Sequence, residues 1–197
     1  ASLTKSALYN VGDRVVTPDG RVFRYAKAGT GGVVAQMGAA NTKPVAAYAV
    51  APAQATVTLK DGSTVVAGAL NSQYLTVTIA SPFGVLGTGV LGEDELRGGY
   101  VVVGNGGSQS PQMRGIIGNP ALAAAGLLTI QLDVPLTAAV TVGTTGIEIL
   151  SNPYLYLVND GITTPGYYVS WMGIPVIAAS VGKYFWLQTW GPCWMTS

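Results

Sequence analysis

The acidic residues Glu93, Asp94 and Glu95 form the chain's one cluster of carboxylates. Two carboxylates hydrolyse a glycosidic bond when they lie roughly 5 to 10 Å apart and one has a raised pKa. Carboxylates also bind Ca²⁺, but these three do not have the spacing of a known calcium loop. Adjacent residues on a solvated turn rarely meet either requirement. With Arg97 close behind, the cluster predicts a charged turn rather than a catalytic or metal site.

The glycines at 87, 89 and 92 match the letters of the dinucleotide-binding fingerprint. In that motif a glycine-rich turn approaches a pyrophosphate at the start of a helix. Here the three carboxylates follow at once and would repel a pyrophosphate, and no alternation of strands and helices surrounds the motif. We therefore expect a glycine-rich loop between strands and no bound nucleotide.

The chain of 197 residues contains no histidine and one cysteine, Cys193. The lack of imidazole excludes histidine-based catalytic triads and the usual zinc sites. Cys193 has no histidine to activate it and no partner for an intramolecular disulfide, so we expect a thiol without a catalytic role. These absences predict a protein that is not an enzyme and that carries no cofactor and no metal.

The net charge is +1, and the ten basic residues are scattered along the chain. Nucleic-acid binding is disfavoured because it needs a basic stripe that follows the phosphates. No apolar run approaches the roughly 20 residues of a membrane span, and the first residues do not read as a secretory signal. Charged residues make up only 10% of the chain, against about 25% in an ordinary domain. Such a surface is covered either by small polar residues or by another protein.

The most distinctive segment is the aromatic stretch 182–194, which holds three of the four tryptophans. On a strand, side chains alternate between two faces, so residues 184, 186, 188 and 190 share one face. Both faces are then largely apolar, and both need cover from a core or a partner. Aromatic rings also stack on sugars, which leaves a glycan site as the alternative. The candidate residues for the core or a partner interface are Tyr184, Trp186, Trp190 and Trp194.

The elements that must position these side chains are predicted to be strands. Glycine occurs 27 times and proline 11 times, and short alternating runs recur without a sustained helical period. The sequence predicts an all-β fold, a barrel or sandwich of short antiparallel strands, with short helical turns only near residues 92–95 and 119–122. Hairpins are expected at 13–25 and 56–66, and further strands at 74–80, 99–103, 127–132, 146–150, 154–158, 166–171, 174–178 and 184–190.

Residues 35–53 are rich in alanine, include Pro44 and Pro52, and follow neither a helical nor a strand period. They predict an extended connector. We therefore expect an N-terminal part, residues 1–53, with an extended arm at 1–10, a hairpin and this connector. The main β domain is expected over residues 54–197.

A resemblance to a known family rests on six segments, residues 9–16, 21–29, 98–106, 127–136, 152–154 and 184–192. Together they resemble a family of tailed-bacteriophage virion proteins of the capsid decoration, or cement, type. Residues 111–115 are less polar than the family pattern. The resemblance implies a structural protein that binds the outer capsid surface and the major capsid protein, forms a homotrimer, and is made in the cytoplasm of the bacterial host. The alternative is a glycan-binding tail or fibre module of a virion.

Overall fold

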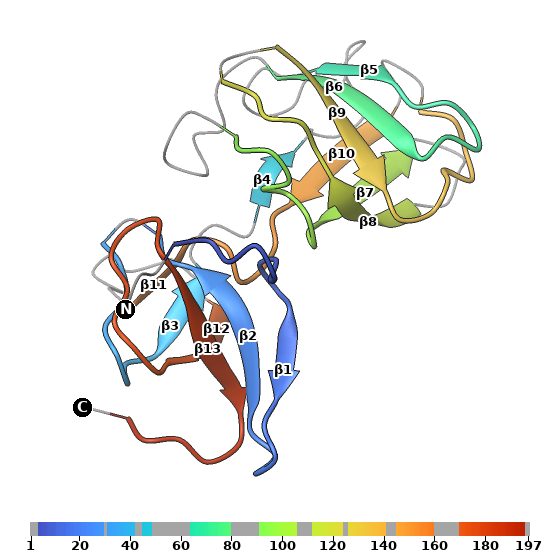
Figure 1. Cartoon of the computed structure of the whole chain (residues 1–197). Helices are drawn as coiled ribbons and strands as arrows, with labels where there is room; N and C mark the ends of the chain where they lie inside the picture. The colour runs from blue at the N-terminus through green and yellow to red at the C-terminus, as the bar shows by residue number, and fades with distance from the viewer. Residues whose placement is uncertain are drawn as a thin grey trace. The chain divides into compact units, whose positions relative to one another are not determined.

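In the computed structural model the described residues form thirteen β-strands and no helix, which confirms the all-β prediction. The described residues are 4–29, 31–41, 45–48, 64–79, 91–105, 112–123, 126–140, 145–159 and 170–195. The strands, labelled in Figure 1, are β1 (Arg14–Val16), β2 (Val22–Lys27), β3 (Ala39–Asn41), β4 (Val45–Tyr48), β5 (Thr64–Ala67), β6 (Tyr74–Ile79), β7 (Tyr100–Asn105), β8 (Gln112–Gly118), β9 (Gly126–Leu132), β10 (Thr145–Leu150), β11 (Leu157–Asn159), β12 (Ser170–Pro175) and β13 (Tyr184–Trp190).

The chain divides into two compact units. Unit 1 comprises Ala1–Pro44 and Asn152–Ser197, and unit 2 comprises Val45–Ser151. This division differs from the expected one, in which residues 54–197 formed a single domain. The physical reason is strand pairing, because β13 near the C-terminus pairs along its length with β2 near the N-terminus.

Unit 1 is built on one antiparallel sheet with the strand order β1-β2-β13-β12-β3-β11. The predicted hairpin at 13–25 is present as β1 and β2, which turn through Pro18-Asp19-Gly20. Proline presets one turn dihedral, and Gly20 adopts a φ of 82° that favours glycine. The sheet curls back on itself, since Ala28 forms a parallel bridge with Leu157 and the Gly29 amide donates to the Leu157 carbonyl at 2.7 Å.

The core of unit 1 is lined largely by small side chains. Phe185 and Leu187 point inward from β13, as the predicted alternation requires. Asn41, Asn152 and Gln188 are also buried and are hydrogen-bonded. The apolar core residues are Ala26, Ala28, Val33, Ala39, Leu157, Ala179, Phe185 and Leu187.

Unit 2 is built on an antiparallel sheet with the order β4-β10-β7-β8-β9-β6-β5. Strands β6, β7 and β9 alternate buried positions with half-buried or exposed ones, as the sequence predicts for 74–80 and 127–132. The buried side chains are larger than in unit 1. They include Leu75, Val77, Val101, Val103, Ile116, Leu128, Ile130, Leu132, Ile147 and Ile149.

Several local predictions need correction. Of the strand expected at 174–178, only Ile174 and Pro175 lie in a strand, β12. Residues 93–98 form hydrogen-bonded turns rather than a helix, and Leu122 is extended and bridges Leu91 instead of starting a helical turn. The predicted connector 35–53 contains two strands, β3 and β4. Strand β8 was not predicted. The strand expected at 154–158 begins only at Leu157.

The hairpin predicted at 56–66 falls mainly outside the described residues. Its second arm overlaps β5, which pairs with β6. The expected boundary near residue 53 and residues 166–169 of a predicted strand also lie outside the described part of the chain.

Candidate interaction surface at the C-terminal strand

Strand β13 presents an aromatic face on the side opposite the core of unit 1. Trp186 is half-buried and lies beside Tyr25 of β2, with ring centroids 5.2 Å apart. The Tyr184 ring stacks on the Tyr25 ring, with centroids 5.6 Å apart. Tyr25 is therefore buried within this cluster. Two of the four candidate residues, Tyr184 and Trp186, thus serve mainly to cover this face within their own unit.

The N-terminal segment completes the same cluster. The Tyr9 ring meets the Trp186 ring edge-on at 4.9 Å, and the Ser6 amide donates to the Tyr25 hydroxyl at 2.9 Å. The sequence predicted an extended arm at 1–10. Residues 4–10 instead lie against the sheet of their own unit, because the aromatic face of β2 and β13 offers them apolar cover.

Lys27 provides the cationic neighbour of these rings. Its ammonium lies 4.8 Å from the centre of the Tyr156 ring and 5.8 Å from that of Tyr184. A cation over an aromatic face is attracted by the ring quadrupole. Lys27 therefore ties the aromatic face of β13 to the turn before β11.

The other two candidates, Trp190 and Trp194, are 72% and 73% exposed. The alternation that should have kept Trp190 beside Trp186 ends at a register shift between Gln188 and Trp190. Neither tryptophan belongs to the core. Cys193 and Met195 between and beyond them are exposed as well. An exposed apolar segment of this kind is typical of a surface that a partner covers.

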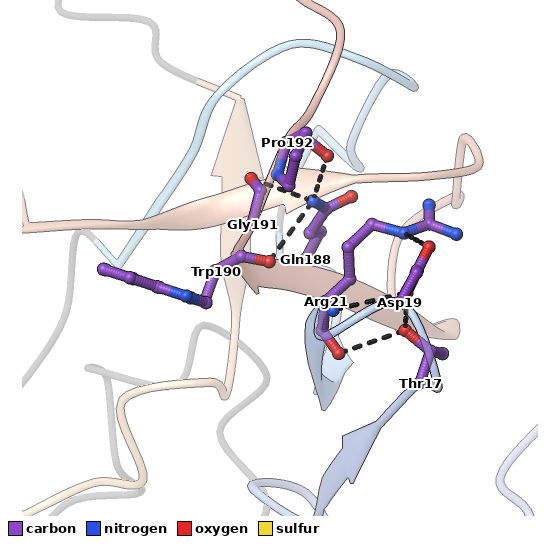
Figure 2. Close-up of polar contacts among 7 residues, drawn as sticks. All are labelled: Thr17, Asp19, Arg21, Gln188, Trp190, Gly191 and Pro192. Carbon is purple, nitrogen blue, oxygen red and sulfur yellow. Dashed lines mark hydrogen bonds and ion pairs between the residues drawn. The ribbon is translucent and has the colours of Figure 1, made fainter.

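Gln188 fixes the start of this exposed segment, and Figure 2 shows the contacts. Its side chain is buried, and its Nε2 donates to the carbonyls of Trp190, Gly191 and Pro192 at 3.3, 3.2 and 2.7 Å. Gly191 has a φ of 93°, and a Cβ there would lie 2.9 Å from Cγ of Arg21. Residues 190–192 are thus held between the Gln188 amide and the Arg21 stem.

A polar cluster in the β1–β2 turn lies nearby in the same view. Arg21 Nε donates to the Asp19 carboxylate at 2.7 Å, and the Thr17 hydroxyl donates to it at 2.5 Å. The Thr17 hydrogen bond, reinforced by Arg21, lowers the pKa of Asp19 to about 2. The Trp190 ring points away from this cluster in Figure 2. The tryptophan and the charged pair therefore do not form one site.

A second exposed apolar group surrounds Trp171 of β12, which the sequence analysis did not single out. The Trp171 ring is 55% exposed and lies directly against Gly38, where a Cβ would not fit. The Asn159 amide holds the neighbouring loop by donating to the carbonyls of Met37 and Gly38 at 3.3 and 3.1 Å. A tryptophan within a predicted strand was the available signal. The exposed apolar side chains here are Val34, Met37, Trp171, Val176 and Ile177.

The acidic cluster has structural contacts. Glu95 Oε2 accepts from the Gly92 amide at 2.7 Å, and Asp94 lies 3.8 Å from Arg97. Asp94 also accepts a hydrogen bond from the Asn119 amide at 3.3 Å. The carboxylates of Asp94 and Glu95 are therefore engaged in holding this turn. Glycines 87 and 89 of the fingerprint fall outside the described residues.

Within the described part of the chain, no three His, Cys, Asp or Glu side chains are grouped so as to hold a metal ion. The same residues include no helix with the length and hydropathy to cross a membrane. Compared with protein-family models, with curated proteins and with solved structures, the chain matches none of them.

Proposed function

We propose that this chain is a structural protein of a tailed-phage virion that binds the outer capsid surface and ties neighbouring major capsid subunits together as a homotrimer. The observation that supports the proposal best is the exposure of Trp190 and Trp194 on a segment held in place by Gln188. Burying a large apolar side chain against a partner contributes about 1.5–3 kcal/mol. Two such side chains on one segment make a partner contact of useful strength.

The composition supports the same proposal. A surface with few charges packs against other proteins without the cost of desolvating long charged side chains. A protein that binds only the assembled shell stabilises it by mass action, by about 4 kcal/mol per site at a thousandfold excess over Kd. Repeated over many sites, this would strengthen a shell against internal pressure.

The exposed tryptophans also favour the second candidate, a glycan-binding tail or fibre module. An exposed indole face is what stacking on a sugar ring requires. Sugar recognition also needs polar groups that converge beside the ring. The Asp19–Arg21 pair does not supply them, because the Trp190 ring points away from it. We therefore place this candidate second.

The test is co-sedimentation of the purified protein with capsids stripped of it, with light scattering of the protein alone. We expect saturable binding at a fixed ratio to the major capsid subunit and the mass of a trimer. Trp190→Ala and Trp194→Ala should remain folded, because both side chains are exposed, and should bind at least about tenfold more weakly. Leu127→Ala is the control, because Leu127 is an exposed apolar side chain of unit 2 and lies outside both exposed apolar groups of unit 1. Binding to polysaccharide but not to capsids would favour the glycan module instead.

A further inference from the structure

The Gln188 amide group meets an unusual set of partners. Three backbone carbonyls, those of residues 190, 191 and 192, converge on its Nε2 within 3.3 Å. Carbonyl oxygens accept hydrogen bonds and never donate, so only the nitrogen end of the amide can face them. The nitrogen carries two hydrogens. Both hydrogens therefore point toward residues 190–192, at the end of β13 and directly after it.

Two further contacts restrict the path of the chain at the same point. The Thr189 hydroxyl donates to the Val22 carbonyl at 3.3 Å, where the pairing of β13 with β2 shifts by one residue. Gly191 passes so close to Arg21 that a side chain there would not fit. The direction in which the chain leaves the sheet is thus set by contacts of residues 188–192.

The exposed tryptophans themselves contribute little to holding the segment. Trp190 and Trp194 leave nearly three quarters of their surface in solvent, so the apolar area that they bury in their own unit is small. The buried polar contacts of Gln188 are what fix this part of the chain.

We propose that Gln188 is a positioning residue for the exposed segment 190–194: its amide holds residues 190–192 in place and so presents Trp190 and Trp194 to the partner in one fixed direction. This inference rests on the proposed function for the identity of the partner. A segment held in its bound path before binding loses less conformational entropy on association, so it binds more tightly.

The direct test uses protein labelled with 5-fluorotryptophan, whose four ¹⁹F resonances are assigned by replacing one tryptophan at a time with phenylalanine. Gln188→Met keeps the length of the side chain and removes the donor. We expect the Trp190 and Trp194 resonances to move toward their positions in denatured protein, while Trp171 and Trp186 keep theirs. Gln188→Glu should have the larger effect, because a carboxylate then faces three carbonyls.

The matched control is Gln112→Glu in unit 2, where the side-chain oxygen already accepts hydrogen bonds from residues 137 and 138. It should leave all four resonances in place. Unchanged Trp190 and Trp194 resonances in Gln188→Met would overturn the proposal. So would movement of all four, since Gln188 would then support unit 1 as a whole rather than the segment.

Comparing single and combined variants tests whether the hydrogen bonds of Gln188 to residues 190–192 contribute to binding. Gln188→Met should weaken binding of the wild-type chain to stripped capsids, and it should cause little further loss in the variant that carries both Trp190→Ala and Trp194→Ala, because Gln188 acts through the two tryptophans. Additive losses would contradict this. If the wild type does not bind capsids, the proposed function fails, while the ¹⁹F result still decides the positioning role.

Discussion

Among the described residues, unit 1 and unit 2 each bury one glutamine, and the two amides make most of their hydrogen bonds at opposite ends. Gln188 is 6% exposed and donates from its nitrogen to three carbonyls. Gln112 is 7% exposed, and its oxygen accepts from the Thr137 amide at 2.6 Å, the Thr137 hydroxyl at 2.9 Å, the Ala138 amide at 3.3 Å and Arg114 at 3.1 Å. Its nitrogen makes one hydrogen bond, to the Ala138 carbonyl at 3.2 Å. The residue type and the burial are the same. The neighbouring groups therefore decide whether the donor or the acceptor end of the amide makes most of the hydrogen bonds. They also decide which substitution each site tolerates.

The comparison extends to what the two units bury. The buried polar side chains among the described residues are five amides and a serine, and none of them is charged. In a chain with so few charges, neutral amide side chains form the buried hydrogen bonds that hold the loops in place. A neutral amide costs less to bury than an ion. The apolar cores differ, since four of the eight residues in the unit 1 cluster that contains Phe185 are alanines, while unit 2 packs mainly leucine, isoleucine and valine.

The largest expected effect tests this difference between the cores. Phe185→Ala should lower the free energy of unfolding by about 3–5 kcal/mol, because the short alanine side chains of its cluster cannot move in to fill the cavity. Denaturant unfolding measures the loss, and hydrogen exchange should show it in β2 and β13. Leu128→Ala, in the aliphatic core of unit 2, should instead raise exchange in β6 and β9. A loss below about 1 kcal/mol for Phe185→Ala would contradict the packing described.

The next effect concerns the buried amide of Asn119, whose oxygen and nitrogen both make hydrogen bonds. Asn119 Oδ1 accepts from the buried Leu96 amide at 2.8 Å, and its Nδ2 donates to the Gly92 carbonyl at 3.0 Å. Asn119→Ala leaves the Leu96 N–H buried and unpaired, which should cost about 1–3 kcal/mol. Asn119→Asp keeps the acceptor for Leu96 and should cost less, as measured by the midpoint of urea unfolding. Equal losses would mean that the donor end carries the stabilisation.

The sequence predicted the local features of this fold and missed the long-range ones. The hairpin at 13–25 is signalled by Pro18-Asp19-Gly20, and β13 by its alternation, and both signals lie within a few residues. The pairing of β13 with β2 brings together residues about 160 positions apart, and no periodicity encodes it. For the same reason the domain boundaries in the structure differ from those expected.

The candidate site was predicted only in part. The aromatic residues of β13 stood out by composition, but their division into covered and exposed ones depends on the register shift after Gln188. That shift, the three carbonyls around the Gln188 amide and the contact of Gly191 with Arg21 all arise from tertiary packing. A glutamine on an aromatic face carries no local signal that it is a buried clamp.

A smaller effect sharpens the contrast between the two glutamines. Gln112→Glu should lower the free energy of unfolding by less than Gln112→Met does, because a carboxylate keeps the hydrogen bonds accepted from Thr137, Ala138 and Arg114 and loses only the one that Nε2 donates to the Ala138 carbonyl. Gln112→Met should lower it, since the donors around residue 112 lose their acceptor. Thermal unfolding of the two variants beside wild type decides the matter. A loss for Gln112→Glu as large as that for Gln112→Met would end the distinction drawn between the two sites.

The smallest effect concerns the hydrogen bonds of the exposed Asp19 carboxylate, compared with those of the buried amides. Asp19 holds the β1–β2 turn through Thr17 and Arg21, as the amides hold their loops, but its carboxylate is open to solvent. Its pKa falls from 3.8 to about 2, so the stabilisation is complete above pH 3.8 and is lost as the pH falls through about 2. A ¹³C NMR titration of the Asp19 carboxyl should give a midpoint near 2, and one near 3.8 after Thr17→Val and Arg21→Met together. Asp19→Asn should alter the turn resonances and leave global unfolding unchanged, because solvent screens an exposed pair. A marked loss of global stability in Asp19→Asn would show that hydrogen-bond geometry, rather than burial, determines how much such hydrogen bonds contribute to stability.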